Sequence, residues 1–146
     1  MCSVECQFPD FNPEDEEIKA ILANSKTVAV VGLSPKPDRD SYRVAKYLME
    51  HGYQIVPVHP KEAEILGQKA YASLKDIPFP VDVVDIFRKI EAIPAIVEEA
   101  IAMGAKVVWM QLGLAENQSA QKAREAGLKV VMNKCMKMEH SRYFPD

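Results

Sequence analysis

The sequence predicts a doubly wound α/β domain, with about five parallel strands and helices on both faces of the sheet. Short apolar runs alternate along the chain with helical patterns about ten residues long, the order that parallel strands require for their crossovers. Glycines stand where several of these segments end. The 146 residues, 48% of them hydrophobic, suffice for one domain with a full core, expected over residues 14–146.

An arm and a helix are expected before the first strand. Residues 1–13 show no periodic pattern and are interpreted as an arm over the surface. Asn12 is expected to cap the helix that follows, in which Ile18, Ile21 and Leu22 share one face.

The expected strands are nearly continuous apolar runs, typical of parallel strands that are buried on both faces. They cover residues 27–31, 54–58, 81–87, 106–110 and 128–132. The helices between them are expected at 42–51, 93–103 and 117–126, with a helical turn at 74–77. Gly104 and Gly127 end the second and third of these helices.

The composition argues against nucleic-acid and membrane partners. A formal net charge of -3 provides no general attraction to either. No apolar run approaches the roughly 20 residues of a membrane-spanning helix, and the N-terminus has no secretory pattern. The basic Lys134, Lys137 and Arg142 are expected on a solvated C-terminal helix. Three cysteines, an odd number, do not indicate a disulfide framework, so the cytoplasm is the expected location.

The segment after the first strand is the candidate ligand site. The apolar run ends at Gly32, and Ser34, Lys36, Arg39 and Ser41 follow before the next helix. Backbone N–H groups at a helix start favour an anion, and arginine side chains match phosphate oxygens. The pattern therefore predicts a phosphate-binding loop.

Two alternatives remain open for the charged side chains of this loop. Lys36, Arg39 and Asp40 can form a solvated turn, as most surface charges do. Asp38 and Asp40 can also cap the helix that follows.

A nicotinamide or flavin dinucleotide is the default ligand of this fold class, but its sequence signals are missing. After Gly32 the chain reads Leu-Ser-Pro-Lys-Pro, without the second and third glycines of the G-x-G-x-x-G fingerprint. The second strand ends in Val58-His59-Pro60-Lys61, with no acid for a ribose 2′-hydroxyl. A basic segment there suits a phosphate better than a diol.

Five segments together resemble the small stand-alone CoA-binding proteins, and through them the N-terminal nucleotide-binding domain of the succinyl-CoA synthetase alpha subunit. The segments are VVGLSP (30–35), YQIVPVHP (53–60), VVDIFR (83–88), VWMQLG (108–113) and NKCMK (133–137). The likeness covers about residues 15–144 and implies a Rossmann-like fold with coenzyme A or an acyl-CoA as ligand.

The resemblance also implies contacts along the whole ligand. The CoA phosphates would meet Gly32, Leu33, Ser34, Pro35, Lys36, Arg39 and Ser41. The adenosine would lie beside Val58, His59, Pro60 and Lys61, with Lys61 a candidate for the 3′-phosphate. Phe87 and Arg88 would flank the nucleotide or the pantetheine arm. The thioester end would lie at Gln111, Gly113, Asn133 and Cys135.

The same resemblance implies binding rather than catalysis. The synthetase's phosphorylated catalytic histidine lies in a second domain that this sequence does not include, so no catalytic residue is assigned. Sensing, storage or delivery of CoA is the expected role, with a protein partner or a homodimer possible. The alternatives are an NAD(P)-dependent oxidoreductase or an acyl-CoA-handling catalyst with a partner subunit, and an interaction module with a vestigial pocket.

Two acids in the third strand are not interpreted as a catalytic pair. Asp82 and Asp85 lie three residues apart on a strand, so their side chains point to opposite faces and cannot share one substrate. One of them is expected to be structural.

The cysteines leave two hypotheses. Cys2, Cys6 and Cys135 with His140 are a possible set of zinc ligands, but the spacing is irregular and no metal is predicted. Cys135 is either a reactive thiol whose pKa is lowered by neighbouring lysines or a small buried residue. If it is reactive, a mixed disulfide with the CoA thiol is expected, and an unchanged intact mass after exposure to oxidised CoA would remove that hypothesis.

Overall fold

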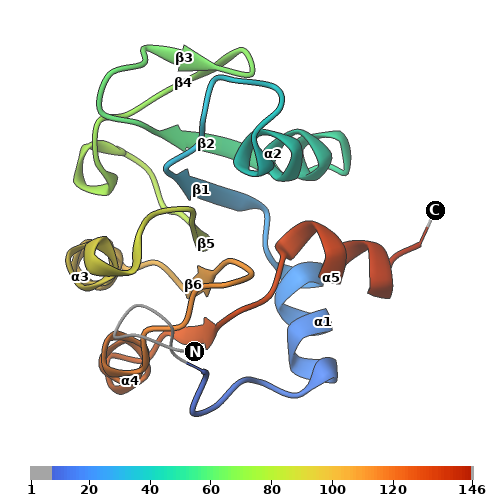
Figure 1. Cartoon of the computed structure of the whole chain (residues 1–146), viewed down its shortest axis with the longest axis vertical. Helices are drawn as coiled ribbons and strands as arrows, with labels where there is room; N and C mark the ends of the chain where they lie inside the picture. Colours follow the sequence, from blue (N-terminus) through green and yellow to red (C-terminus); the bar gives the residue numbers. More distant parts are fainter. Residues whose placement is uncertain (1–7, 146) are drawn as a thin grey trace.

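Five parallel strands form the centre of the molecule, in the spatial order β2-β1-β5-β6-β7 (Figure 1). The structure is a computed structural model and describes residues 8–145. The strands are β1 (Thr27–Val31), β2 (Gln54–Val58), β5 (Val83–Ile86), β6 (Val107–Met110) and β7 (Lys129–Val131). The doubly wound α/β fold expected from the sequence is confirmed.

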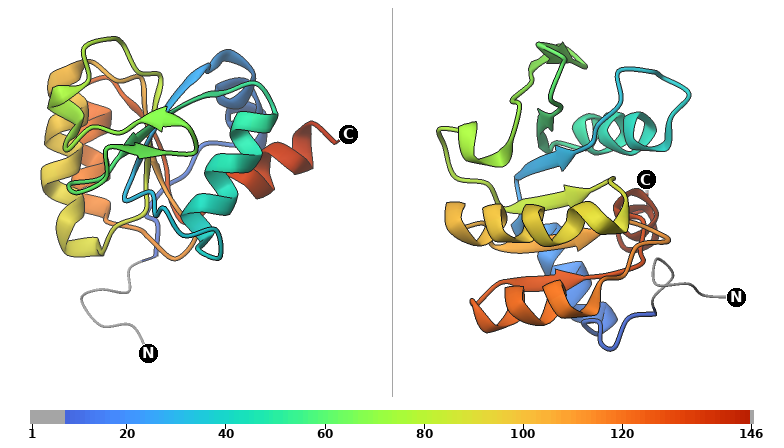
Figure 2. Two further views of the ribbon diagram at one scale, coloured as in Figure 1. Left: turned by 90° about the horizontal axis from the view of Figure 1, so that it is seen from above. Right: turned by 60° about the vertical axis from the view of Figure 1, so that its left-hand side comes forward.

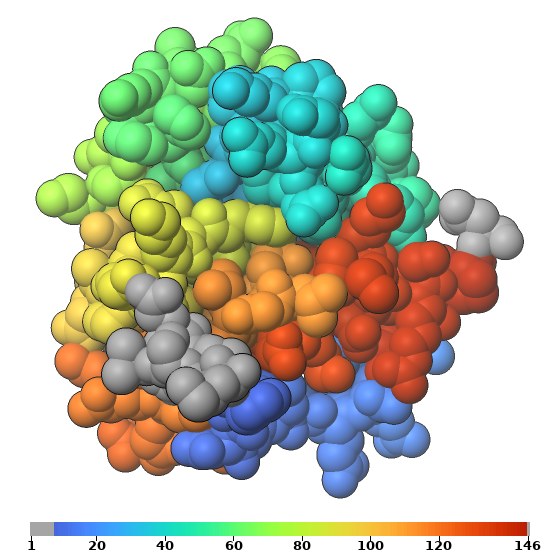
Figure 3. Space-filling model, in the orientation of Figure 1, coloured from blue at the N-terminus to red at the C-terminus, as the bar shows by residue number. Residues whose placement is uncertain are grey.

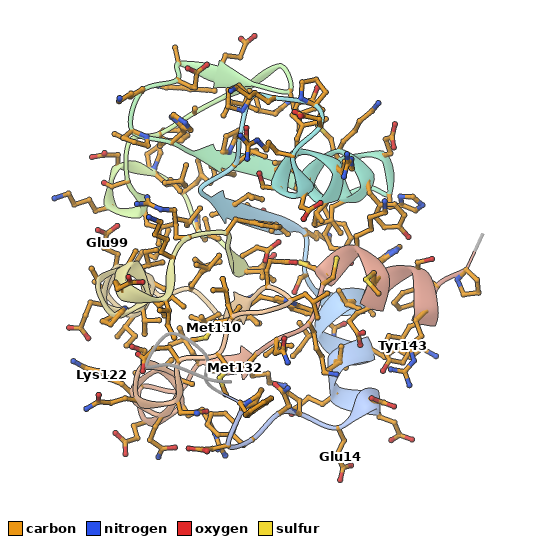
Figure 4. All side chains as sticks on the ribbon, in the orientation of Figure 1. Glu14, Glu99, Met110, Lys122, Met132 and Tyr143 are labelled. Carbon is orange, nitrogen blue, oxygen red and sulfur yellow. The ribbon has the colours of Figure 1, made fainter. Side chains whose placement is uncertain are left out.

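Helices cover both faces of this sheet (Figure 2). One face carries α1 (Asp15–Asn24), α2 (Asp40–Glu50) and α5 (Met136–Tyr143), and the other carries α3 (Ile93–Met103) and α4 (Asn117–Glu125). Successive strand residues point to opposite faces, so Val28 and Val30 join the core under the first set, whereas Ala29 and Val31 join the core under the second. Met110 and Met132 lie inside the second core (Figure 4).

The expected bounds of 27–31, 54–58 and 93–103 agree with β1, β2 and α3. The expected strand at 81–87 is longer than the observed β5. Asp82, directly before β5, still pairs through its backbone, with its amide donating to the Thr27 carbonyl (3.0 Å), and its side chain binds the start of β1. Its Oδ2 accepts hydrogen bonds from the amides of Lys26 (2.8 Å) and Thr27 (3.1 Å). Of the two acids Asp82 and Asp85, Asp82 therefore has the structural role.

A short antiparallel hairpin, β3 (Glu64–Ile65) and β4 (Gln68–Lys69), was not predicted. Each strand has only two residues, too few for a periodic signal. The turn uses two left-handed residues, Leu66 and Gly67, and the hairpin lies beside β2.

The predicted cap at Asn12 is wrong. Glu14 occupies the N-cap position of α1, and no side chain accepts a cap hydrogen bond there. Asn12 instead binds the backbone of Met132, with Nδ2 donating to the carbonyl oxygen (2.9 Å) and Oδ1 accepting from the amide (2.8 Å). β7 is an edge strand, so its backbone groups need partners from outside the sheet. Asn12 therefore binds backbone groups of a segment distant in the sequence instead of capping the helix next to it.

The described part of the arm, residues 8–13, continues along α4. The Asp10 amide donates to Asn117 Oδ1 (2.7 Å), and Asn117 Nδ2 donates to the Phe8 carbonyl (2.7 Å). Within residues 8–145, no helix has the length and apolar character needed to cross a membrane.

A close backbone approach at Gly32 fixes the exit from β1. The residue has a φ of +86°, and its amide donates to the Val58 carbonyl (3.0 Å). A Cβ at this position would lie 2.3 Å from the carbonyl oxygen of Phe87 and 2.8 Å from Cδ of Arg88. The chain leaving β5 therefore passes directly over Gly32, with space for no side chain.

Gly32→Ala is expected to destabilise the fold by about 3 kcal/mol or more, because left-handed strain and backbone overlap add together. Gly127→Ala is the matched control, since Gly127 has a φ of +94° but no atom within 4 Å of the position that a methyl group would take. The control should lose only the strain, about 1 kcal/mol. Urea unfolding of both variants measures the difference, and equal losses would contradict the close approach.

Candidate functional site

The chain reverses its winding direction at β1, because β1 pairs with β2 on one side and with β5 on the other. In open parallel sheets, ligands bind where the loops after two such strands part. A cavity of about 770 Å³ lies at this position, a volume within the usual range of small-molecule sites.

Four segments line the cavity and meet on one face of the molecule (Figure 3). They are the start of α2, the loop after β5, the loop after β6 and the start of α5, coloured cyan, yellow, orange and red. Val44, Phe87, Leu112, Leu114 and Met138 supply its apolar lining. Leu112 and Met138 are exposed, by 62% and 59%.

The charged side chains at the cavity are mostly basic. Four cations, Arg43, Arg88, Lys89 and Lys137, face a single acid, Asp40. The Arg43–Asp40 pair has an N–O distance of 3.3 Å, and because it is exposed it neutralises little. Arg88 and Lys89 form no ion pair with any residue in the range 8–145. The cavity mouth is therefore locally positive on a chain of net charge -3.

The loop between β1 and α2 is held by its own serines. The Ser34 amide donates to Ser41 Oγ (3.0 Å), and the Lys36 amide donates to Ser34 Oγ (3.1 Å). Arg39 is the N-cap residue of α2, and no side chain caps this helix. The proposed capping by Asp38 or Asp40 is therefore wrong, and the first-turn amides of α2 remain available. Each serine hydroxyl still has a proton to donate.

The structure brings together only part of the predicted site. Phe87, Arg88, Gln111 and Cys135 line the cavity, and Gly32 lies beneath the first two. Leu33 is buried, so only its backbone can face a ligand. The remaining predicted residues of this segment do not line the cavity; they are Ser34, Pro35, Lys36, Arg39 and Ser41.

Two further groups of predicted residues are engaged elsewhere. Val58, His59, Pro60 and Lys61 lie at the end of β2, outside the cavity, where His59 Nδ1 accepts hydrogen bonds from the amides of Lys61 (3.0 Å) and Glu62 (3.2 Å). Gly113 and Asn133 bind each other, with the Gly113 amide donating to Asn133 Oδ1 (2.7 Å).

Several lining residues were not assigned by the sequence. Lys89 and Leu112 directly follow predicted site residues, so extending each strand-end segment by one position would have found them. Lys137 lies in the resembling segment NKCMK but was expected on a solvated helix, and Met138 directly follows that segment. Both reach the cavity because α5 packs beside α2.

The two acids near β5 have opposite environments. Burial by itself would raise the pKa of Asp82, but hydrogen bonds from the Lys26 and Thr27 amides and from Lys106 outweigh it, so that pKa is lowered. Asp85 is completely buried. Its Oδ1 accepts a hydrogen bond from Gln111 Nε2 (2.7 Å), and its Oδ2 has no partner within residues 8–145. Burial raises the pKa of the Asp85 carboxyl to about 7, and the Gln111 hydrogen bond lowers it only in part.

Cys135 is half-buried at the N-cap position of α5, and its thiol is free. Burial raises its pKa, against the lowering effect of the Met138 and Lys137 amides, and the charge of Asp85 raises it further. The expectation of a lowered pKa is therefore wrong, because desolvation outweighs the neighbouring lysine. The alternative, a small buried residue, fits better, although the structure leaves Cys135 half-buried.

No group of three or more potential metal ligands occurs within residues 8–145. His140 Nδ1 lies 3.0 Å from the Tyr47 hydroxyl. Cys2 and Cys6, which the zinc hypothesis needs, lie outside the described residues.

Comparisons with known proteins show what this chain is similar to. A family model described as "CoA binding domain" matches residues 26–141. The uncharacterized protein YneT of Bacillus subtilis (strain 168) is 45% identical over 130 residues, which are 89% of this chain and 96% of YneT. A hypothetical protein from Pyrococcus horikoshii OT3 has a solved structure with 47% identity and a TM-score of 0.88, covering 98% of this chain and 99% of that one. The alpha subunit of acetate–CoA ligase (ADP-forming) I of Pyrococcus furiosus is 36% identical in an alignment of length 126 that covers 75% of this chain and 27% of the subunit.

Asp85→Asn is expected to remove a pH dependence of stability. The carboxyl has a pKa of about 7 in the folded chain and about 3.9 when unfolded. The folded state therefore holds its proton more tightly, and wild-type stability falls as the pH rises from about 4 through about 7. The loss is on the order of 4 kcal/mol.

Urea unfolding of wild type and variant at several pH values measures this difference. Asp82→Asn is the control with the opposite sign, because a lowered pKa contributes stability above the unfolded value that is lost as the pH falls. Parallel pH profiles for wild type and Asp85→Asn would contradict the raised pKa.

Proposed function

The chain belongs to the CoA-binding domain family, and on that premise we propose that it binds coenzyme A, or an acyl-CoA, in the 770 Å³ cavity at the ends of β5 and β6. The observation that carries the proposal is the basic mouth of this cavity. Coenzyme A bears its negative charge on phosphates, and a net-negative protein needs a local positive field to hold them.

Arg88 is the side chain best placed for a phosphate. Its Cδ lies over the Gly32 position, at the start of the predicted phosphate-binding loop. Arg88 also lines the cavity, so its side chain lies between that loop and the cavity. Within residues 8–145 no carboxylate holds its guanidinium. An arginine fork makes charge-assisted, bidentate contacts with phosphate oxygens, about twice as strong as neutral hydrogen bonds.

The start of α2 supports the same ligand. Its uncapped first-turn amides and the positive end of its dipole favour an anion. Ser34 and Ser41 fix the loop through the Ser34 amide, so the backbone is ordered before a ligand arrives. A site ordered in advance loses less entropy on binding.

A nicotinamide dinucleotide is disfavoured by the end of β2. Residues 59–61, directly after the strand, include no acid, and His59 Nδ1 already accepts hydrogen bonds from two backbone amides. Lys61 is exposed beside it and suits a phosphate group, such as the 3′-phosphate of CoA. These residues support the adenosine end of the proposed ligand, outside the cavity itself.

We propose binding rather than catalysis by this chain. It spans only 27% of the acetate–CoA ligase alpha subunit that it matches, so the ligase reaction is not transferred to it. The ligase relative is a subunit of a larger enzyme, which supports a protein partner as one possible recipient of the bound CoA. Sensing and storage are equally compatible roles.

Thermal-shift measurements with CoA, acetyl-CoA, NAD and NADP test the proposal, because a bound ligand stabilises the native state by mass action. CoA is expected to raise the melting temperature, whereas NAD and NADP are not. Arg88→Gln should weaken CoA binding about tenfold or more through the lost charged hydrogen bonds. Arg124→Gln is the matched control, because Arg124 packs on the Phe11 ring, 4.1 Å from its centroid, away from the cavity.

Stabilisation by NAD without CoA would favour the oxidoreductase alternative. No shift with any of the four compounds would favour the interaction module. Equal CoA affinities of Arg88→Gln and wild type would show that Arg88 does not bind the phosphates of CoA.

A further inference from the structure

Asp85 is a carboxyl group in the apolar core, where packing alone gives no reason for an acid. It stands in the middle of the sheet, aligned with Val30 on β1 and Trp109 on β6, and none of its surface is exposed. One carboxylate oxygen has no hydrogen-bond partner within residues 8–145. A buried carboxyl group with so few partners destabilises a fold, and an apolar residue would pack there without this penalty.

The one partner of Asp85 in the described chain is a residue of the cavity. Gln111 is buried, lines the cavity, and donates from Nε2 to Asp85 Oδ1 at 2.7 Å. A carboxylate can only accept hydrogen bonds, so it admits the NH₂ group of Gln111 and not its oxygen. The amide of Gln111 is thereby held in one of its two orientations.

This orientation leaves Gln111 Oε1 for a ligand. No residue in the described part of the chain donates a hydrogen bond to that oxygen. We propose that Asp85 is a positioning residue that makes Gln111 Oε1 an acceptor in the cavity, so that the site prefers a ligand ending in a hydrogen-bond donor, the free thiol of CoA, over an acyl thioester. The inference rests on the proposed function.

The hydrogen-bonding groups of a free thiol and of a thioester explain why CoA is preferred over an acyl-CoA. A free thiol has an S–H proton to donate, although weakly, whereas a thioester offers only acceptors. Because the exposed Arg88 and Lys89 take the phosphate end, the buried Gln111 meets the sulfur end of the ligand. An acceptor there favours the thiol and leaves the thioester carbonyl facing another oxygen.

The test compares CoA with acetyl-CoA and with desulfo-CoA, in which hydrogen replaces the thiol. Calorimetric titrations at about pH 8 keep Asp85 ionised, because its pKa is about 7. Wild type is expected to bind CoA about threefold to tenfold more tightly than either analogue, the range of one hydrogen bond. In Asp85→Asn, the affinity for CoA should exceed the affinities for acetyl-CoA and for desulfo-CoA by about twofold or less. The reason is that an amide both donates and accepts hydrogen bonds, so it no longer fixes the orientation of Gln111.

Two further variants complete the experiment. Asp82→Asn makes the same chemical change at the other end of β5, where the side chain binds the Lys26 and Thr27 amides, and should keep the wild-type ratios. Gln111→Met removes the acceptor itself and should lose the preference as Asp85→Asn does. It keeps the test valid if Asp85→Asn does not fold.

The outcomes separate this inference from the proposed function. Absence of CoA binding to wild type would overturn both. CoA binding with equal or tighter binding of acetyl-CoA and desulfo-CoA would overturn the inference alone. Wild-type ratios retained in folded Asp85→Asn would show that Asp85 is merely structural, and would also overturn it.

Discussion

The pairing of β1 with two parallel neighbours is the constraint on which the candidate site depends. β2 and β5 both align with β1, so all three strands end at the same edge of the sheet. The crossover after β1 carries α2 to one face, and the crossover after β5 carries α3 to the other. A crevice must open between them. The absent side chain at Gly32 lets the two exits approach closely enough to share one cavity.

Charge is distributed within this cavity by depth. Basic side chains such as Arg88 and Lys137 stand at its mouth, where water still solvates them and a diffusing anion meets them first. Gln111 and the carboxyl of Asp85 lie below, where desolvation is strong. An elongated ligand with a polyanionic end and a neutral thiol end matches that gradient in one direction only.

The interior of the sheet also shows a conflict between stability and site chemistry. β5 is apolar at Val83, Val84 and Ile86, yet carries a carboxyl group at Asp85. Burial opposes its ionisation, and a single hydrogen bond compensates only in part. Side chains that break the local rules of a core are characteristic of functional positions, because selection for a fold alone would replace them.

The sequence by itself determined the features that depend on neighbouring residues. Continuous apolar runs specified β1 and β2 to the residue, and helical periodicity with a closing glycine specified α3. The order of strands and helices was enough for the fold class. The resemblance to the CoA-binding proteins indicated Phe87, Arg88 and Gln111, which line one cavity.

Tertiary structure alone decided the partners that come from distant segments. Asn12 binds Met132 rather than α1, the Asp82 side chain binds the Lys26 and Thr27 amides, and α5 brings Lys137 to the cavity. The raised pKa of Asp85 likewise follows from complete burial, which no local pattern reports. The physical reason is common to all of them: a hydrogen bond or a desolvation energy depends on which groups meet in space, and a linear pattern records only which groups are adjacent along the chain.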